Sequence, residues 1–207
     1  MKTHCKFLAL TGALLATGFG TMPQAHAAGD PMAMKATVDA NFDKLFMLHA
    51  AQGNMAEVMT GKLALQKSKN PAVRNVATTI IKGHGDAQKI LLTHFKHLNL
   101  TPPKDPGVAN KATYAMLSKL NGAAFDKAFM ASQVDAHEAT ITLFEHEIEN
   151  GKIGMVKAHA VNTLPGIFMH TAMIYDAAVM VKAPGIDLRP KAIRDAAKGA
   201  AMMKHSM

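Results

Sequence analysis

The sequence predicts an all-α protein built as a four-helix bundle, in which two antiparallel helical hairpins are joined by one long crossover containing a short extra helix. Three observations lead to this prediction. The chain has no tryptophan and few aromatic residues, and it shows no run of alternating apolar and polar residues typical of strands. Four long stretches instead repeat apolar residues at spacings of three and four, which is the pattern of one helix face. Short turns join these stretches in pairs, and a proline-rich loop separates the two pairs.

The first 27 residues have the features of a secretory signal peptide. Lys2 and Lys6 form a short basic start, an apolar run follows, and residues 25–27 (AHA) form a small-x-small cleavage site. The single cysteine, Cys5, lies before the apolar run, so the mature chain would contain neither a lipid-anchoring cysteine nor a disulfide. We therefore expect a periplasmic or otherwise exported protein that is stabilised by packing alone.

The charge of the chain is basic. Loss of Lys2 and Lys6 with the signal peptide lowers the net charge from +8 to +6. A basic surface attracts anionic partners, and in an exported protein envelope lipid or polysaccharide fits better than nucleic acid. We expect no nucleic-acid partner and peripheral contact with an anionic envelope surface at most, with a simple solvated surface as the plainer interpretation. No second run of about 20 apolar residues stands out, so we expect a soluble protein of undetermined oligomeric state.

The chain divides into four parts. We expect a signal peptide at 1–27, a disordered leader at 28–36, the bundle at 37–182 and a basic tail at 183–207. The long helices are expected at 37–69, 71–98, 125–151 and 155–182, with a short helix at 108–120 in the crossover. Asn70 should cap the second helix and Pro71 should begin it, whereas Pro165 should bend the last one. Two hairpins joined by one long crossover form the ferritin-like pattern.

Three of the four long helices carry a histidine on the predicted core face: His84, His137 and His170. Such a residue needs a partner, because leaving a buried polar group unsatisfied costs roughly 1–3 kcal/mol. Gly83 and Gly85 flank His84, which is costly in a helix and indicates close packing or room for a bulky neighbour.

The first helix is less clear, because it has two adjoining candidate core faces. The three-four spacing places Leu45 and His49 on its predicted core face, and the same spacing places Val161 on that of the last helix. The adjoining face of the first helix carries small residues that would allow close helix approach. Glu57 is the single charged residue on that face.

Counting from the turns brings the polar core residues level in pairs. Glu57 lies 13 residues before the end of the first helix, and His84 lies 13 residues after the start of the second. His137 and His170 lie 15 and 18 residues from the second turn, a mismatch of about 4 Å at 1.5 Å per residue. The sequence does not give the docking of the two hairpins, so it leaves open whether both pairs share one layer.

This arrangement resembles the exported, ferritin-like domain of unknown function 4142 family over residues 36–178. The resemblance is carried by AAQGNMAEV (50–58), GKLALQKSKNPAVRNVA (61–77), His84, GAAFDKAFM (122–130), Val134 with His137-Glu138, LFEHEIENG (143–151) and TLPGIFMH (163–170). It implies the four-helix fold and an envelope location, and little about activity. Members often have an acidic residue just before these histidines, whereas this chain has Gly83, Ala136 and Met169 there.

The residues can be compared with the di-iron template of helical bundles, which uses a Glu from each of two helices and a Glu-x-x-His pair from each of the others. Both Glu-x-x-His pairs are broken here, because isoleucine stands three residues before His84 and before His170. One carboxylate and three imidazoles remain, namely Glu57, His84, His137 and His170. Such a set suits a single Zn, Cu or Fe ion better than a carboxylate-bridged pair. We therefore predict these four residues as ligands of one ion, and a metal-dependent redox enzyme as a weaker alternative.

A hydrogen-bonded polar layer is the other interpretation of the same residues. A lone histidine on an apolar face is usually a satisfied core residue, and Glu57 could accept a hydrogen bond from one and fix the helix register. The protein would then be a structural or stress-related envelope protein without turnover. No nucleophile elbow, phosphate-binding loop or zinc-finger spacing favours an enzyme.

Three further histidines lie outside this set. His94 and His97, three residues apart, could bind metal at the surface but more simply face solvent. His159 is expected at the core or its boundary.

Overall fold

The computed structural model describes residues 31–188 and residue 195. The predicted signal peptide and most of the predicted basic tail lie outside these residues. The described part is all-helical, as the sequence predicts, and contains no strand. Its elements are α1 (Pro31–Lys67), α2 (Pro71–His97), α3 (Val108–Ser118), α4 (Gly122–Asn150), α5 (Gly154–Val181) and a short 3-10 helix, η1 (Ile186–Leu188).

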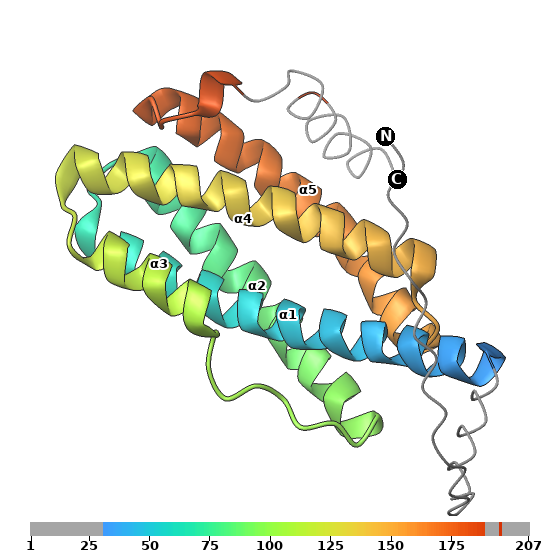
Figure 1. The fold of residues 1–207 in the computed structure, drawn as a ribbon. Coiled ribbons are helices and arrows are strands. Elements are labelled where there is room, and N and C mark those ends of the chain that lie inside the picture. The colour runs from blue at the N-terminus through green and yellow to red at the C-terminus, as the bar shows by residue number, and fades with distance from the viewer. Residues whose placement is uncertain (1–30, 189–194, 196–207) are drawn as a thin grey trace, which may run out of the picture.

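The helices pack as two hairpins side by side (Figure 1). α1 pairs with α2 and α4 pairs with α5, while α2 also contacts α5 and α1 contacts α4. The crossover from α2 to α4 contains α3, which packs on α1 and α4. This arrangement confirms the predicted four-helix bundle with one long crossover.

Side chains of α1 fix the chain at both ends of the bundle. At one end Lys67 Nζ donates to the carbonyl of Leu120 at 2.7 Å, which brings the crossover back beside the α1–α2 turn. Asn70 caps α2 there as predicted, because its Oδ1 accepts from the backbone N–H of Ala72 at 2.9 Å. At the other end Asp43 accepts from the backbone N–H groups of the α4–α5 turn.

The beginning of α1 differs from the expectation. The helix starts at Pro31, so residues 31–36 are helical rather than part of a disordered leader. Proline suits the first helical position, and the Met-Ala-Met-Lys-Ala that follows consists of good helix formers.

The predicted core face of α1 is wrong at two positions. Leu45 is 50% exposed and His49 is exposed, whereas the adjoining Phe46 and Ala50 are buried. The face with small residues is the interior one because it lets α1 and α2 approach closely. A Cβ on Gly61 would lie 2.8 Å from Cγ1 of Ile81, which only glycine avoids.

The last helix, α5, is strongly apolar. Val161, predicted in the core, is 48% exposed, so the apolar residues of α5 extend beyond its buried face. Contrary to the expectation of no second apolar run, α5 is long and apolar enough to cross a membrane, with a mean hydropathy of 1.4 over 18 residues. Half of that window is buried in the bundle, and core helices of soluble proteins meet the same criterion. α5 also continues through Pro165 without a break, and its bend stays a prediction.

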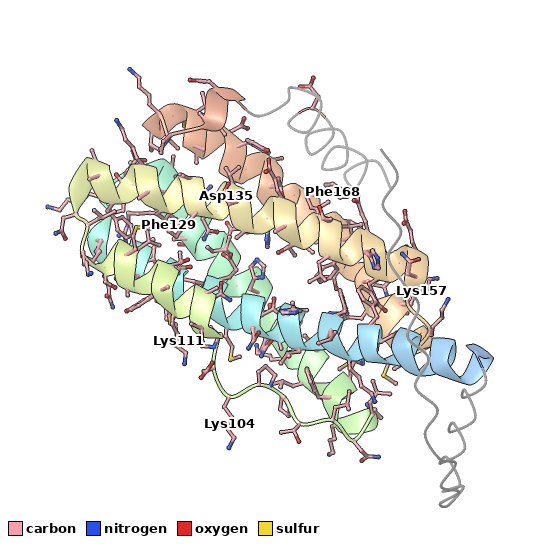
Figure 2. All side chains as sticks on the ribbon, viewed as in Figure 1. Lys104, Lys111, Phe129, Asp135, Lys157 and Phe168 are labelled. Carbon is pink, nitrogen blue, oxygen red and sulfur yellow. The ribbon has the colours of Figure 1, made fainter. Side chains whose placement is uncertain are left out.

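Apolar clusters lie on either side of the three core histidines along the bundle. One includes Ile80, Phe129 and Ile174, and the other includes Phe46 and Leu91. Phe129 points into the bundle whereas the lysines labelled in Figure 2 lie on the outside. The histidines therefore form a polar layer inside an otherwise apolar core.

Candidate functional site

His84, His137 and His170 meet in the middle of the bundle because each lies near the midpoint of its helix. Residue 84 is the midpoint of α2, and residues 137 and 170 lie within three residues of the midpoints of α4 and α5. These helices have similar lengths, so packing the two hairpins side by side brings their midpoints to one height. This geometry settles the docking that the sequence leaves open, and it places the three histidines in one layer.

The three imidazoles are close and buried. The ring centroids lie 5.5 Å apart for His84 and His137, 5.4 Å for His84 and His170, and 6.0 Å for His137 and His170. One ligating nitrogen from each ring lies within 4.8 Å of the other two. The side chains are 8%, 1% and 8% exposed, respectively. The group therefore has the residue types and the spacing of a three-histidine metal site.

Neighbouring groups fix the tautomer of two of these rings. Nδ1 of His84 donates to Oδ1 of Asn54 at 2.9 Å, and Nδ1 of His137 donates to the carbonyl of Gln133 at 3.1 Å. Because Nδ1 carries the proton in both rings, Nε2 presents a lone pair. Both Nε2 atoms are buried, and neither has a hydrogen-bond partner among the described residues. Metal-binding histidines are typically oriented in this way, by a hydrogen bond at the nitrogen that does not bind the ion.

The environment keeps these rings uncharged. Burial, followed by the neighbouring His137 and His170, holds the pKa of His84 well below its usual 6.5. Burial, followed by His170, lowers the pKa of His137 to about 3. Neutral imidazole is the form that binds a metal ion, so no proton has to leave these two rings near neutral pH.

Gly83 makes room for His170. A Cβ at this position would lie 2.5 Å from Cε1 and 2.8 Å from Nε2 of the His170 ring. The expectation of a bulky neighbour is thus confirmed for Gly83. It is wrong for Gly85, where nothing lies within 4 Å of an added Cβ.

Glu57, the fourth predicted ligand, lies beside this group but is not one of its three members. Its side chain is 7% exposed, and burial raises its pKa to about 8, while a hydrogen bond with the side chain of Gln133 acts in the opposite direction. Its partner is therefore Gln133 rather than a histidine, as the polar-layer interpretation had supposed. Oε2 of Glu57 is buried without a hydrogen-bond partner among the described residues.

Sequence reasoning missed Asn54 and Gln133, which hold the histidines. Gln133 lies four residues before His137, one turn away on the same helix face, so a polar residue on that face was the available signal. Asn54 lies three residues before Glu57 on the inner face of α1, which the sequence analysis did not choose as the core face.

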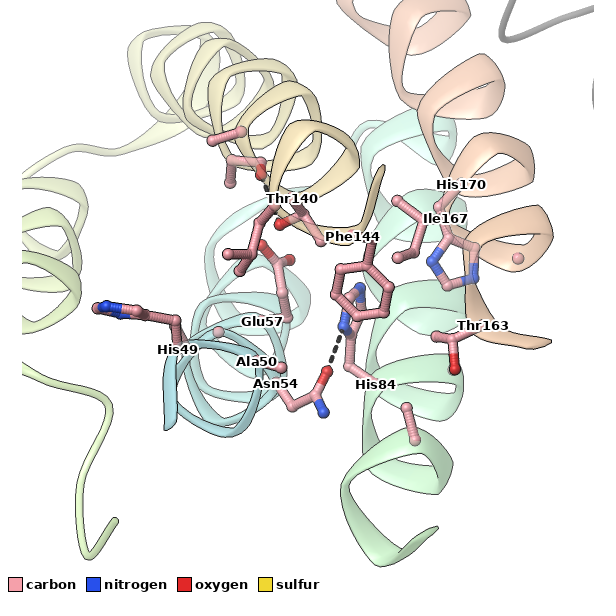
Figure 3. A pocket seen from close by; sticks show the side chains of 18 of the residues that line it. His49, Ala50, Asn54, Glu57, His84, Thr140, Phe144, Thr163, Ile167 and His170 are labelled. Atoms are coloured by element: carbon pink, nitrogen blue, oxygen red, sulfur yellow. Dashed lines mark hydrogen bonds between the residues drawn. The ribbon is translucent and has the colours of Figure 1, made fainter. Parts of the chain in front are cut away.

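A cavity of about 410 Å³ adjoins the layer (Figure 3). It is lined by Glu57, His84 and His170 and by apolar side chains that include Phe144 and Ile167. His49 lines its edge and points away from the other polar residues. An ion held by the histidines would therefore face a space large enough for water or a small ligand.

Comparison with known proteins identifies the family. The model for a domain of unknown function, DUF4142, matches residues 27–176, and the chain belongs to this family. Among solved structures, the chain is similar to one described as "putative secreted protein DUF305 from Streptomyces coelicolor", with a TM-score of 0.59 and 14% sequence identity. That likeness covers 70% of this chain and 96% of the other, and it concerns the fold. A search of curated proteins finds no match.

Proposed function

We propose that this protein is an exported helical bundle that binds one transition-metal ion, Zn, Cu or Fe, through His84, His137 and His170. The observation that carries the proposal is the pair of buried Nε2 atoms on His84 and His137, which are oriented by hydrogen bonds at Nδ1 and have no partner of their own among the described residues. Imidazole is a favoured ligand of these ions.

The geometry fits an ion after a small adjustment. At metal–nitrogen distances of about 2.0–2.1 Å, ligands at tetrahedral angles lie about 3.3 Å apart. The ligating atoms of the three histidines lie within 4.8 Å of one another. Closing the largest separation this allows needs movements of roughly 1 Å, which side-chain rotation provides. We propose Glu57 as the neighbouring carboxylate that binds the ion directly or balances its charge.

The alternative is a polar layer whose role is structural. The bonds from Asn54 to His84 and from Gln133 to Glu57 favour it, since they show that the layer is partly satisfied within the protein. It leaves two buried imidazole nitrogens unexplained, because a structural layer would pair them. A metal ion accounts for both.

Export is proposed on two grounds. Residues 1–27 have the composition of a signal peptide, and the structural neighbour is described as secreted. N-terminal sequencing of protein from the envelope fraction should begin within a few residues of Ala28. An intact Met1 terminus there would overturn this part of the proposal.

Metal analysis and thermal melting test the ion site. Protein from its native compartment should hold close to one equivalent of metal, and adding the correct ion to apo protein should raise its melting temperature, because the ion binds the folded state. His137→Ala should abolish this rise while the apo protein still folds, since the bundle has a large apolar core without the ion. His49→Ala is the matched control, because this exposed histidine points away from the layer.

Two results would contradict the proposal. One is metal content below about a tenth of an equivalent together with no melting shift for Zn, Cu or Fe. The other is a shift of equal size in wild type and His137→Ala. His137→Ala would then lower stability by about 1–3 kcal/mol with or without metal, which is the expectation for a structural layer.

A further inference from the structure

A second histidine pair lies outside the three-histidine layer. His94 of α2 and His159 of α5 have ring centroids 5.1 Å apart, with the ring planes at 76°. This is as close as the rings within the layer. The sequence analysis treated the two residues separately, because they are distant in the chain and only the packing of α2 against α5 brings them together.

The pair repeats the His84–His170 pair further along the same helix interface. His94 follows His84 by ten residues, and His159 precedes His170 by eleven. At 1.5 Å per residue the two pairs are about 15–16 Å apart along the helices. Because α2 and α5 are antiparallel, these nearly equal spacings make both pairs meet.

The two imidazoles differ in their access to solvent. His159 is 6% exposed and packs against Phe144, and the structure records no hydrogen bond from its ring to another described residue. His94 is partly exposed. His97 follows one turn later at the surface, and its Nδ1 lies 2.8 Å from the carbonyl of Thr93, which leaves Nε2 available. Imidazoles thus extend from the surface at His97 through His94 to the buried His159.

The interior member of this pair reaches the cavity beside the layer. His159 lines the same cavity as His84, His170 and Glu57. An ion bound between His94 and His159 would therefore have a hollow, rather than close-packed core, between it and the three-histidine layer.

We propose that His94 and His159 form a second, outer site for a transition-metal ion, which takes up the ion at the surface and passes it through the cavity to the inner layer. Binding at the outer pair stands by itself, whereas delivery rests on the proposed function. Two imidazoles provide fewer ligands than three, so the outer site should bind more weakly and release its ion inward.

Titration of the full mature chain with Zn²⁺ tests the outer site. Wild type should show a tight and a weaker class of site, and His137→Ala should keep only the weaker one. Adding His94→Gln and His159→Gln to His137→Ala should remove it, with at least a tenfold loss of the remaining affinity. Apo melting curves show whether each variant folds, and the single variant His94→Gln, at a partly exposed position, provides a test that does not disturb the core.

Rapid mixing with Zn²⁺ tests delivery. The His94→Gln/His159→Gln variant should load the inner site at least tenfold more slowly than wild type, with an inner-site affinity within about twofold of wild type. His49→Gln, at another point on the cavity edge, should load at the wild-type rate.

Each contrary result has a distinct meaning. If Zn²⁺ binding to His137→Ala is unchanged when His94 and His159 are replaced, the outer site is wrong. If loading is equally fast in all variants, delivery is wrong. If only the outer variants change binding and His137→Ala changes nothing, the outer site stands and the proposed inner function fails.

Discussion

Two regions of this bundle bury charged or titratable groups, and they use them differently. Near the α4–α5 turn, Asp43 is fully buried, and its carboxylate accepts from the backbone N–H of Lys152 at 3.1 Å and of Ile153 at 2.8 Å. These are groups that the start of α5 leaves without helical partners. In the middle of the bundle, Nε2 of His84 and of His137 has no such partner among the described residues.

The difference separates a structural polar group from a candidate ligand. The burial of Asp43 is explained by the fold, because its carboxylate binds backbone that would otherwise be unsatisfied. The hydrogen bonds of His84 and His137 orient the rings and leave the inner nitrogens unused, which the fold alone does not explain. Burial does not distinguish the two regions, whereas the direction of the hydrogen bonds does.

The largest expected effect on stability is at Asp43. Asp43→Ala should lower the free energy of unfolding by about 2–4 kcal/mol, because it leaves two backbone donors unsatisfied and removes a buried charged acceptor. The loss should be the same with and without added Zn²⁺, and urea unfolding measures it. Asp86→Ala is the control, since its ion pairs with Lys82 and Lys89 are exposed and should contribute under about 1 kcal/mol. A metal-dependent loss at Asp43 would make the two regions alike and remove the distinction.

The sequence predicts the histidine layer better than the region around Asp43, for a physical reason. The layer follows from helix lengths, since residues near the midpoints of equally long helices meet whenever hairpins pack side by side. Asp43 binds the chain 109 residues away, and no local pattern reports such a contact. The inner face of α1 was mistaken because two adjoining faces both suit a core, and only the close approach at Gly61 decides between them. Histidine positions are thus predictable from spacing, whereas the groups that orient them depend on three-dimensional docking.

An intermediate effect concerns the pH dependence of apo stability. Burial raises the pKa of Glu57 from its usual 4.5 to about 8, so the folded state holds a proton that the unfolded state loses between these values. Its contribution is therefore full below pH 4.5 and is lost as pH rises toward 8. Burial, and then the charge of Asp43, raises the pKa of Glu147 to about 8, so Glu147 acts in the same direction. Burial lowers the pKa of His137 to about 3, so its contribution is full above pH 6.5 and is lost as pH falls toward 3.

Glu57→Gln separates the two regions in this dependence. Each raised carboxyl group should lower apo stability by about 1 kcal/mol between pH 6.5 and 7.5, against a limit near 1.4 kcal/mol per pH unit. Glu57→Gln should remove its share and leave the share of Glu147. Urea unfolding at the two pH values measures the difference. An identical pH slope in wild type and Glu57→Gln would show that Glu57 is already ionised in the folded apo protein.

The smallest expected effect on stability comes from the two glycines beside His84, and it tests the geometry of the layer most directly. Gly85→Ala should stabilise the protein by about 0.5–1 kcal/mol, because alanine suits a helix better and nothing lies within 4 Å of the new Cβ. Gly83→Ala gains the same helix preference, but its Cβ would lie 2.5 Å from Cε1 of His170, so the ring must move. We expect its net stability change to be close to zero or unfavourable, and its Zn²⁺ affinity to fall at least tenfold, while Gly85→Ala binds Zn²⁺ as wild type does. Thermal melting of the apo proteins and Zn²⁺ titration of the same samples measure both quantities. If the two variants gain equal stability and bind Zn²⁺ equally well, the His170 ring does not occupy the space beside Gly83, and the three-histidine layer is not the metal site.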